Sequence, residues 1–164
     1  AQVGAETGDL QNLREGMSYR SLKTLQGPFS RFRRHPELAP EYINNPEKIG
    51  NMQYDGKNGN YPGTGDGYRY RGGGMIQVTG RANYRALGYE SNPEALANPE
   101  IAAQTGAKHW RMIGFNAMSG APLTRAQFDK VMRRINPGAN KQMMDDRYAR
   151  YVTSARVLGL DGVR

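Results

Sequence analysis

The sequence contains no cysteine, and this absence excludes disulfide bonds and thiolate-ligated metal sites. It has only two histidines, His35 and His109, and neither stands in a spacing typical of metal ligands, so we interpret both as structural or surface residues. No apolar run approaches the roughly 18 residues of a membrane-spanning helix. The N-terminus shows neither the basic nor the apolar segment of a signal peptide, so we expect none. We predict no cofactor and no metal.

Acidic residues are outnumbered, with 15 aspartates and glutamates against 23 lysines and arginines, and the net charge is +8. Such a charge attracts nucleic acid, anionic lipid or an anionic cell-wall polymer, and it does not choose among them. The 164 residues suffice for one domain with a real core, and no repeat, linker or low-complexity segment divides them. We therefore expect a single domain over residues 1–164.

Helix-start signals recur along the chain and predict a mainly helical protein. Asn45 and Asn98 each precede a proline, the pattern of an N-cap followed by proline at the first helical position. Thr124 and Gln127 have the spacing of a capping box. Between the helices, residues 55–67 are rich in turn signals and are expected to form a loop. The expected helices cover residues 1–7, a short turn in 9–15, then 18–26, 46–54, 80–87, 99–113, 125–135 and 140–158.

The central stretch, residues 68–84, changes character three times. Residues 68–71 alternate tyrosine and arginine, the period-two pattern of a short exposed strand, and form the small β element that we expect. Three glycines follow and leave the backbone bare, so that a ligand or another segment can come close. Thr79 is the expected N-cap of the next helix. Neutral hydrogen-bonding and aromatic side chains edge this bare surface, which suits a sugar: Tyr68, Tyr70, Gln77, Thr79 and Asn83.

Glycine-rich turns with tyrosines are also ordinary loop material, and this alternative stays open at this point. A phosphate-binding loop is disfavoured, because G-x-x-x-x-G-K-[ST] does not occur and the three glycines do not form G-x-G-x-x-G between a strand and a helix.

Two glutamates near the N-terminus form a candidate acid–base pair. Glu6 lies among small and apolar neighbours, where desolvation favours a carboxyl that keeps its proton. On one continuous helix Glu15 would point to the opposite face, about 13.5 Å further along the axis, but Gly8 and Asp9 break that helix. Two carboxyl groups about 6.5–9.5 Å apart with a water between them are the arrangement of inverting glycosidases. The alternative is a helix-end charge at Glu6 and a local ion pair between Glu15 and Arg14.

Five segments together resemble a known enzyme family. They are residues 1–8, 14–21, 65–72, 76–84 and 133–136. They resemble the family 19 glycoside hydrolases, and among these the chitinase-like endolysins of bacteriophages. The resemblance covers nearly the whole chain in the same order, and the central stretch is its most specific part.

The resemblance implies a lysozyme-like α+β fold that is mainly α, with two helical lobes around a deep cleft. It implies that Glu6 is the general acid and Glu15 the general base, and that Thr79 helps to hold the attacking water. The implied sugar-binding residues are Gln77, Asn83 and Asn136, with Tyr19, Tyr68 and Tyr84 as further candidates for the cleft lining.

This sequence departs from the family pattern at three places. Only five residues precede Glu6, where family members usually have a longer helix. Gly73 stands where these endolysins often have arginine, and Pro137 stands where glycine is usual. The first departure concerns the N-terminal lobe, and the other two concern the rim of the cleft more than the chemistry.

The resulting hypothesis is a peptidoglycan-degrading glycosidase of the endolysin type that inverts β-1,4 bonds in the cell-wall glycan. We expect a monomer that binds peptidoglycan strands and anionic cell-surface polymers but no nucleic acid. It would be made in the cytoplasm of a bacterial host and act in the periplasm. The alternatives are a chitinase and, from another class, a noncatalytic basic module that binds cell wall or nucleic acid.

Overall fold

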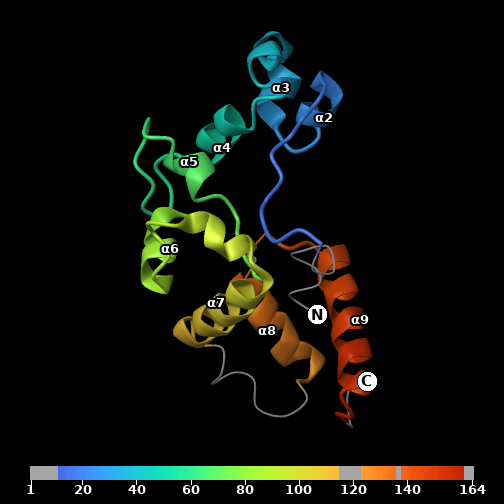
Figure 1. Ribbon diagram of the computed structural model, residues 1–164. Coiled ribbons are helices and arrows are strands. Elements are labelled where there is room, and N and C mark those ends of the chain that lie inside the picture. Colours follow the sequence, from blue (N-terminus) through green and yellow to red (C-terminus); the bar gives the residue numbers. More distant parts are fainter. Residues whose placement is uncertain (1–10, 115–122, 136–137, 161–164) are drawn as a thin grey trace.

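The computed structural model describes residues 11–114, 123–135 and 138–160, and this part of the chain is mainly helical (Figure 1). The mainly α prediction is therefore confirmed. None of the helices in these ranges is long and apolar enough to cross a membrane. In chain order the helices are α2 (Leu22–Gln26), α3 (Ser30–Arg34), η1 (Pro36–Glu41), α4 (Pro46–Tyr54), α5 (Asp66–Arg69), α6 (Arg81–Leu87), η2 (Pro93–Ala97), α7 (Pro99–Met112), α8 (Arg125–Ile135) and α9 (Lys141–Val157).

Four of the predicted helices, α4, α7, α8 and α9, begin where expected. The side-chain oxygen of Asn45 accepts a hydrogen bond from the Lys48 amide at 3.0 Å and starts α4. Asn98 and Asn140 cap α7 and α9 in the same way. These asparagine oxygens satisfy amide groups that have no partner within the first helical turn. At α8 the side chains of Thr124 and its partner three residues later bond each other's backbone amides, as in a capping box.

Two predicted N-caps were wrong, one by three residues and one by a single residue. Helix α2 begins after Ser21, which forms a capping box with Thr24, and not after Ser18. Helix α6 begins after Gly80, which has a φ of +95°, and the hydroxyl of Thr79 donates to the Gln77 carbonyl at 3.0 Å instead of capping the helix. The chain passes so close to a neighbouring loop here that a side chain on Gly80 would clash with it. This close passage places the N-cap at Gly80, one residue beyond the predicted Thr79.

The strand predicted for residues 68–71 is wrong, because α5 occupies the first two of these positions. Helix α5 follows Gly65, whose φ of +81° turns the chain into the helix. In the turn after α5 the Arg71 amide donates to the Tyr68 carbonyl at 3.3 Å, and the Arg71 guanidinium lies 4.1 Å from the centre of the Tyr68 ring. Antiparallel bridges occur next to it instead and join Gly73 to Arg14 and to Val78.

The helical turn expected at residues 9–15 is wrong for the described part, residues 11–15. Arg14 forms the bridge to Gly73 there, and the Gly74 amide donates to the Leu13 carbonyl at 2.8 Å. Pairing with a distant segment has replaced local helical bonding. The helix expected at residues 1–7 lies outside the described residues.

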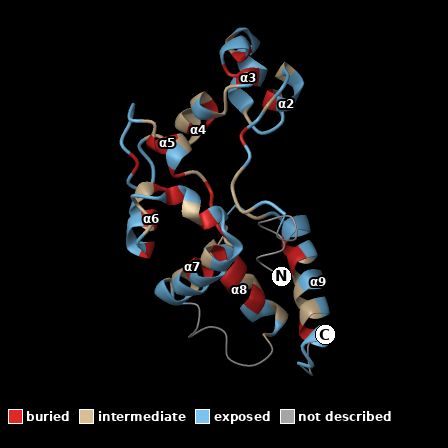
Figure 2. Cartoon of the chain, in the orientation of Figure 1, coloured by how far each residue is buried: buried red, intermediate tan, exposed pale blue. Residues whose placement is uncertain are grey.

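The buried side chains form three apolar clusters along the chain (Figure 2). The first lies among α2, α3, η1 and α4, at one end of the molecule in Figure 1. The second packs Tyr70 and Val78 against Tyr84, Leu87 and Leu96, and so anchors both sides of the central stretch. The third joins α8 to α9 through Phe128, Met132 and Met144. The arrangement of two lobes around a deep cleft stays a prediction.

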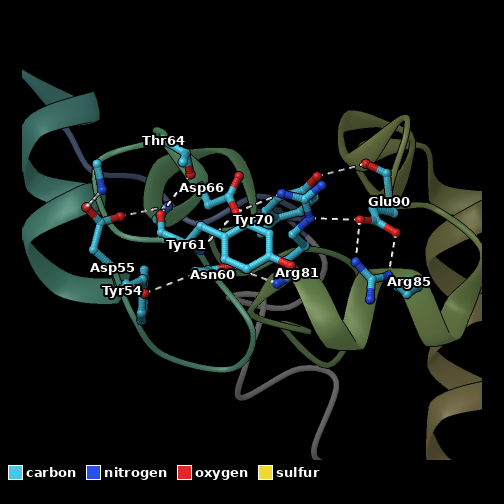
Figure 3. A network of polar contacts seen from close by, with 12 residues as sticks. Tyr54, Asp55, Asn60, Tyr61, Thr64, Asp66, Tyr70, Arg81, Arg85 and Glu90 are labelled. Carbon is cyan, nitrogen blue, oxygen red and sulfur yellow. Dashed lines mark hydrogen bonds and ion pairs between the residues drawn. The ribbon is translucent and has the colours of Figure 1, made fainter.

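A polar network holds the turn-rich loop between α4 and α6 (Figure 3). Asn60 and Asp66 are both 4% exposed. Asn60 donates to the Tyr54 carbonyl at 3.0 Å and accepts from the Arg81 amide at 2.8 Å. Asp66 accepts from the Tyr61 amide and forms an ion pair with Arg81 at 3.2 Å. The network therefore links the end of α4 to the start of α6, and it determines where Tyr54 lies relative to the central stretch.

Candidate functional site

The Glu15 carboxylate is held by partners that are distant in sequence. The Tyr54 hydroxyl lies 2.8 Å from Oε1 and 3.0 Å from Oε2, and the Gly72 amide donates to Oε2 at 3.0 Å. The backbone is held as well, because the Glu15 amide donates to the Gly72 carbonyl at 2.8 Å and Arg71 Nε donates to the Glu15 carbonyl at 3.2 Å. The side chain is only half-buried. A carboxylate that is oriented in this way and still reachable by water is suited to act as a base.

The alternative role for Glu15, a local ion pair with Arg14, is not what the structure contains. Arg14 forms an ion pair with Glu94 at 2.6 Å and donates to the carbonyls of Arg69 and Arg71, each at 3.1 Å. It therefore braces the chain between α5 and the glycines, next to the place where Glu15 is bound.

Gly72 lies between Glu15 and Gln77. A methyl group in place of its hydrogen would lie 2.6 Å from the Gln77 amide oxygen and 3.2 Å from Oε2 of Glu15. The two side chains can approach the same point only because Gly72 has no side chain. The close approach expected at these glycines is therefore made by two segments of the protein, and it brings Glu15 next to the polar residues of the central stretch.

Three of the predicted site residues lie together in one pocket. Gln77, with a φ of +51°, donates from its amide nitrogen to the Gly74 carbonyl at 3.1 Å. The hydroxyl of Thr79 donates to the Gln77 carbonyl, and Asn83 Nδ2 donates to the Thr79 carbonyl at 2.8 Å. These bonds orient the three side chains along a pocket of about 370 Å³. Its other lining residues are Asn58, Ile76, Val78, His109, Trp110, Ile113, Arg134 and Ile135.

One wall of the pocket was not predicted from the sequence. Helix α7 supplies His109 and Trp110, Ile113 follows directly after it, and α8 supplies Arg134 and Ile135. His109 was expected to be structural or on the surface. Burial lowers the pKa of His109, so near neutral pH the ring is an uncharged hydrogen-bonding group. The indole of the single tryptophan is the one sequence signal that pointed to this helix, since aromatic faces bind the apolar faces of sugars.

The three predicted tyrosines do not line this pocket. Tyr84 has no exposed surface, and its hydroxyl donates to the Arg71 carbonyl at 2.8 Å, so it supports the central stretch from within the core. Tyr68 and Tyr19 pack against the first apolar cluster. Burial and, secondly, the charge of Glu15 raise the pKa of Tyr19.

Two further predicted site residues, Glu6 and Asn136, lie outside the described residues. Among the residues that are described, no group of three or more histidine, aspartate or glutamate side chains is arranged to hold a metal ion.

The buried tyrosine of the core should make stability fall at high pH. Burial raises the pKa of Tyr84 to about 12, against about 10 for an exposed tyrosine. The folded state thus binds the phenolic proton more tightly than the unfolded chain does. The resulting stabilisation, about 2–3 kcal/mol, is complete below pH 10 and is lost as the pH rises to 12.

This effect can be measured as the free energy of unfolding in denaturant at pH 9 to 12, for the wild type and Tyr84→Phe. We expect the wild type to lose stability more steeply, so that the difference between the two proteins shrinks with rising pH. A difference that stays constant would contradict the role of Tyr84.

Comparison with known proteins gives one informative match. No protein-family profile matches the chain. A protein of Haemophilus influenzae named glycosyl hydrolase family 19 domain-containing protein is 34% identical over 146 residues. The match covers 85% of this chain and 69% of that protein. It runs through most of both sequences, so it agrees with the resemblance noted in the separate segments, and the chain belongs to glycosyl hydrolase family 19.

Proposed function

We propose that this protein is an inverting glycoside hydrolase that cleaves β-1,4 bonds in the peptidoglycan of the bacterial cell wall, in the manner of an endolysin. One observation carries the proposal. The Glu15 carboxylate is oriented by Tyr54 and Gly72 and lies beside Gln77, which continues into the pocket with Thr79. Family membership supports glycoside hydrolysis, and the charge of +8 supports an anionic wall polymer as the substrate.

The proposed reaction is a single displacement. Glu6 gives its proton to the glycosidic oxygen as the bond from the anomeric carbon to that oxygen breaks. A water attacks the same carbon from the opposite face and passes a proton to Glu15. The proton of the Thr79 hydroxyl is used in its bond to the Gln77 carbonyl, so the oxygen of Thr79 is available to accept a hydrogen bond from that water. Gln77, Asn83 and Asn136 would bind the sugar.

The proposal also includes the domain organisation, the oligomeric state and the location of the enzyme. Residues 1–164 would act as one catalytic domain and as a monomer, without a cofactor or metal and without binding nucleic acid. The protein would be made in the cytoplasm of a bacterial host and would reach the glycan in the periplasm.

A chitinase is the second candidate, because the pocket residues Gln77, Thr79 and Asn83 are neutral and would suit N-acetylglucosamine of chitin as well. Zymography on gels that contain purified sacculi or colloidal chitin separates the two. We expect clearing on sacculi and little on chitin. Clearing on chitin alone would favour the chitinase, and no clearing combined with a shift of nucleic acid in a gel would favour a binding module.

The stereochemistry tests the mechanism independently of the substrate. Proton NMR in the first minutes of digestion, before mutarotation, should show the α-anomer released from a β-linked glycan. An initial β-anomer would mean that Glu15 attacks the sugar itself, and it would overturn the single displacement.

A further inference from the structure

We propose that Tyr54 is a positioning residue for Glu15, and that it turns the carboxylate so that Oε1 is the oxygen that takes the proton from the attacking water. The inference rests on the proposed role of Glu15 as the base. It adds the residue that orients the base and the atom that receives the proton.

The direction of the hydrogen bonds around Tyr54 follows from the chemistry of its neighbours. The amide nitrogen of Gln53 lies 2.8 Å from the Tyr54 hydroxyl, and an amide nitrogen only donates. The phenol oxygen therefore accepts from Gln53, and its single proton is directed to Glu15. An ionised carboxylate only accepts, so the chain of bonds from Gln53 through Tyr54 to Glu15 has one consistent direction.

The two oxygens of Glu15 are occupied unequally. Oε2 accepts from the Gly72 amide at 3.0 Å and lies 3.0 Å from the Tyr54 hydroxyl. Among the described residues, Oε1 has the Tyr54 hydroxyl at 2.8 Å as its hydrogen-bond partner. Each carboxylate oxygen has two acceptor sites. The single Tyr54 proton is within reach of both oxygens, so Oε1 has at most this one donor from the described part of the chain and keeps an acceptor site for a water, whereas Oε2 has the Gly72 amide as a donor in addition.

Tyr54 is held firmly enough to serve this role. It is the last residue of α4, its carbonyl accepts from buried Asn60, and its ring packs against the first apolar cluster. Burial and, secondly, the negative charge of Glu15 raise the pKa of Tyr54 above that of an ordinary tyrosine. The hydroxyl therefore stays protonated over the working range of pH and is a permanent donor. Neither Tyr54 nor Glu15 is among the lining residues of the pocket, and the proton of the Tyr54 hydroxyl is used in its bond to Glu15, so Tyr54 acts through Glu15.

Tyr54→Phe removes the donor and retains the ring, which makes it the variant of choice. We expect kcat to fall about 10- to 100-fold, the usual scale for a hydrogen bond to a charged group, with KM nearly unchanged. The acidic limb of the pH–rate profile should move to higher pH, because the anion of Glu15 loses a hydrogen bond that stabilises it. A purely structural role would lower the amount of active protein and leave the pH profile and KM where they are.

Tyr89→Phe is the matched control, since Tyr89 is a partly buried tyrosine of the second apolar cluster. It should leave kcat and the pH profile unchanged. Gln53→Leu removes the donor to Tyr54 and should give a smaller change in the same direction as Tyr54→Phe.

A carbon-13 NMR titration gives a readout that does not depend on activity. The carboxyl signal of Glu15, assigned by its absence in Glu15→Gln, should titrate at higher pH in Tyr54→Phe than in the wild type. An unchanged titration would overturn the inference even if the enzyme is active. If the titration shifts but the wild-type protein does not cleave glycan, the contact between Tyr54 and Glu15 is supported and the proposed function is overturned. An active Tyr54→Phe with wild-type kcat and pH profile would overturn the positioning role alone.

Discussion

Replacing Glu15 by glutamine should lower kcat/KM on purified sacculi by about 10²- to 10⁴-fold, the range that a general base contributes. The amide has the size of the carboxylate but cannot take a proton from water. It also brings a donor to a place where Gly72 and Tyr54 both donate. The amide keeps only one of the two acceptor oxygens that these donors use, so we expect a loss of stability of about 1–3 kcal/mol in addition to the loss of activity.

The measurement is turbidity clearing of sacculi together with thermal unfolding followed by circular dichroism. Glu37→Gln is the control, because Glu37 is exposed on η1. Among the described contacts, its carboxylate pairs only with the exposed His35. It should retain full activity. If Glu15→Gln keeps more than about a tenth of the wild-type activity, Glu15 is not the base.

Replacing Gly72 by alanine should reduce activity about 100-fold or more, although no functional group is removed. The new methyl group would lie 2.6 Å from the Gln77 amide oxygen and 3.2 Å from Oε2 of Glu15. Gln77 would have to turn away from the Gly74 carbonyl, and the carboxylate would shift. Displacements of about 1 Å at a reacting group cost on the order of 100-fold in rate, and forcing a methyl group into a packed site costs about 1–3 kcal/mol of stability.

Gly27→Ala is the matched control for this substitution. Gly27 follows α2 with a φ of −56°, which alanine adopts readily, and a methyl group there would lie 3.6 Å from the nearest atom, the Thr24 carbonyl oxygen. Assays of both variants on sacculi, with melting curves, compare the same chemical change at the two places. Full activity in Gly72→Ala would mean that Glu15 and Gln77 need not be held around this glycine.

The sequence predicted those helices whose starts depend on hydrogen bonds between residues close together in the chain. An asparagine before a proline caps α4 and α7 within three residues of itself, so the sequence alone is sufficient there. The alternation of tyrosine and arginine in residues 68–71 was misleading, since Tyr68 and Arg69 end α5 and Arg71 covers the Tyr68 ring in the turn that follows. At Arg14, pairing with Gly73 replaces the predicted helical turn. Such long-range pairing leaves no local pattern in the sequence.

The candidate site was likewise predicted only in part from the sequence. Family resemblance pointed to Glu15, Gln77, Thr79 and Asn83, and the structure places the last three in one pocket, with Glu15 next to Gln77. Their catalytic and binding roles stay predictions. Tyr54 was not predicted, because its bond to Glu15 joins residues 39 apart and no sequence motif contains both.

The anchoring of Glu15 also determines when this site can exist during synthesis. Its carboxylate meets the Gly72 amide across 57 residues, and the neighbouring Arg14 meets Glu94 across 80. Closing such long loops has an entropic cost, and only the contact with the remote partner offsets it. The bonds to Glu15 and Arg14 therefore form only after these partners have been synthesised. A nascent chain on the ribosome therefore has no fully oriented base until Gly72, 57 residues after the glutamate, has emerged. The glutamate is therefore made well before the residues that orient its carboxylate.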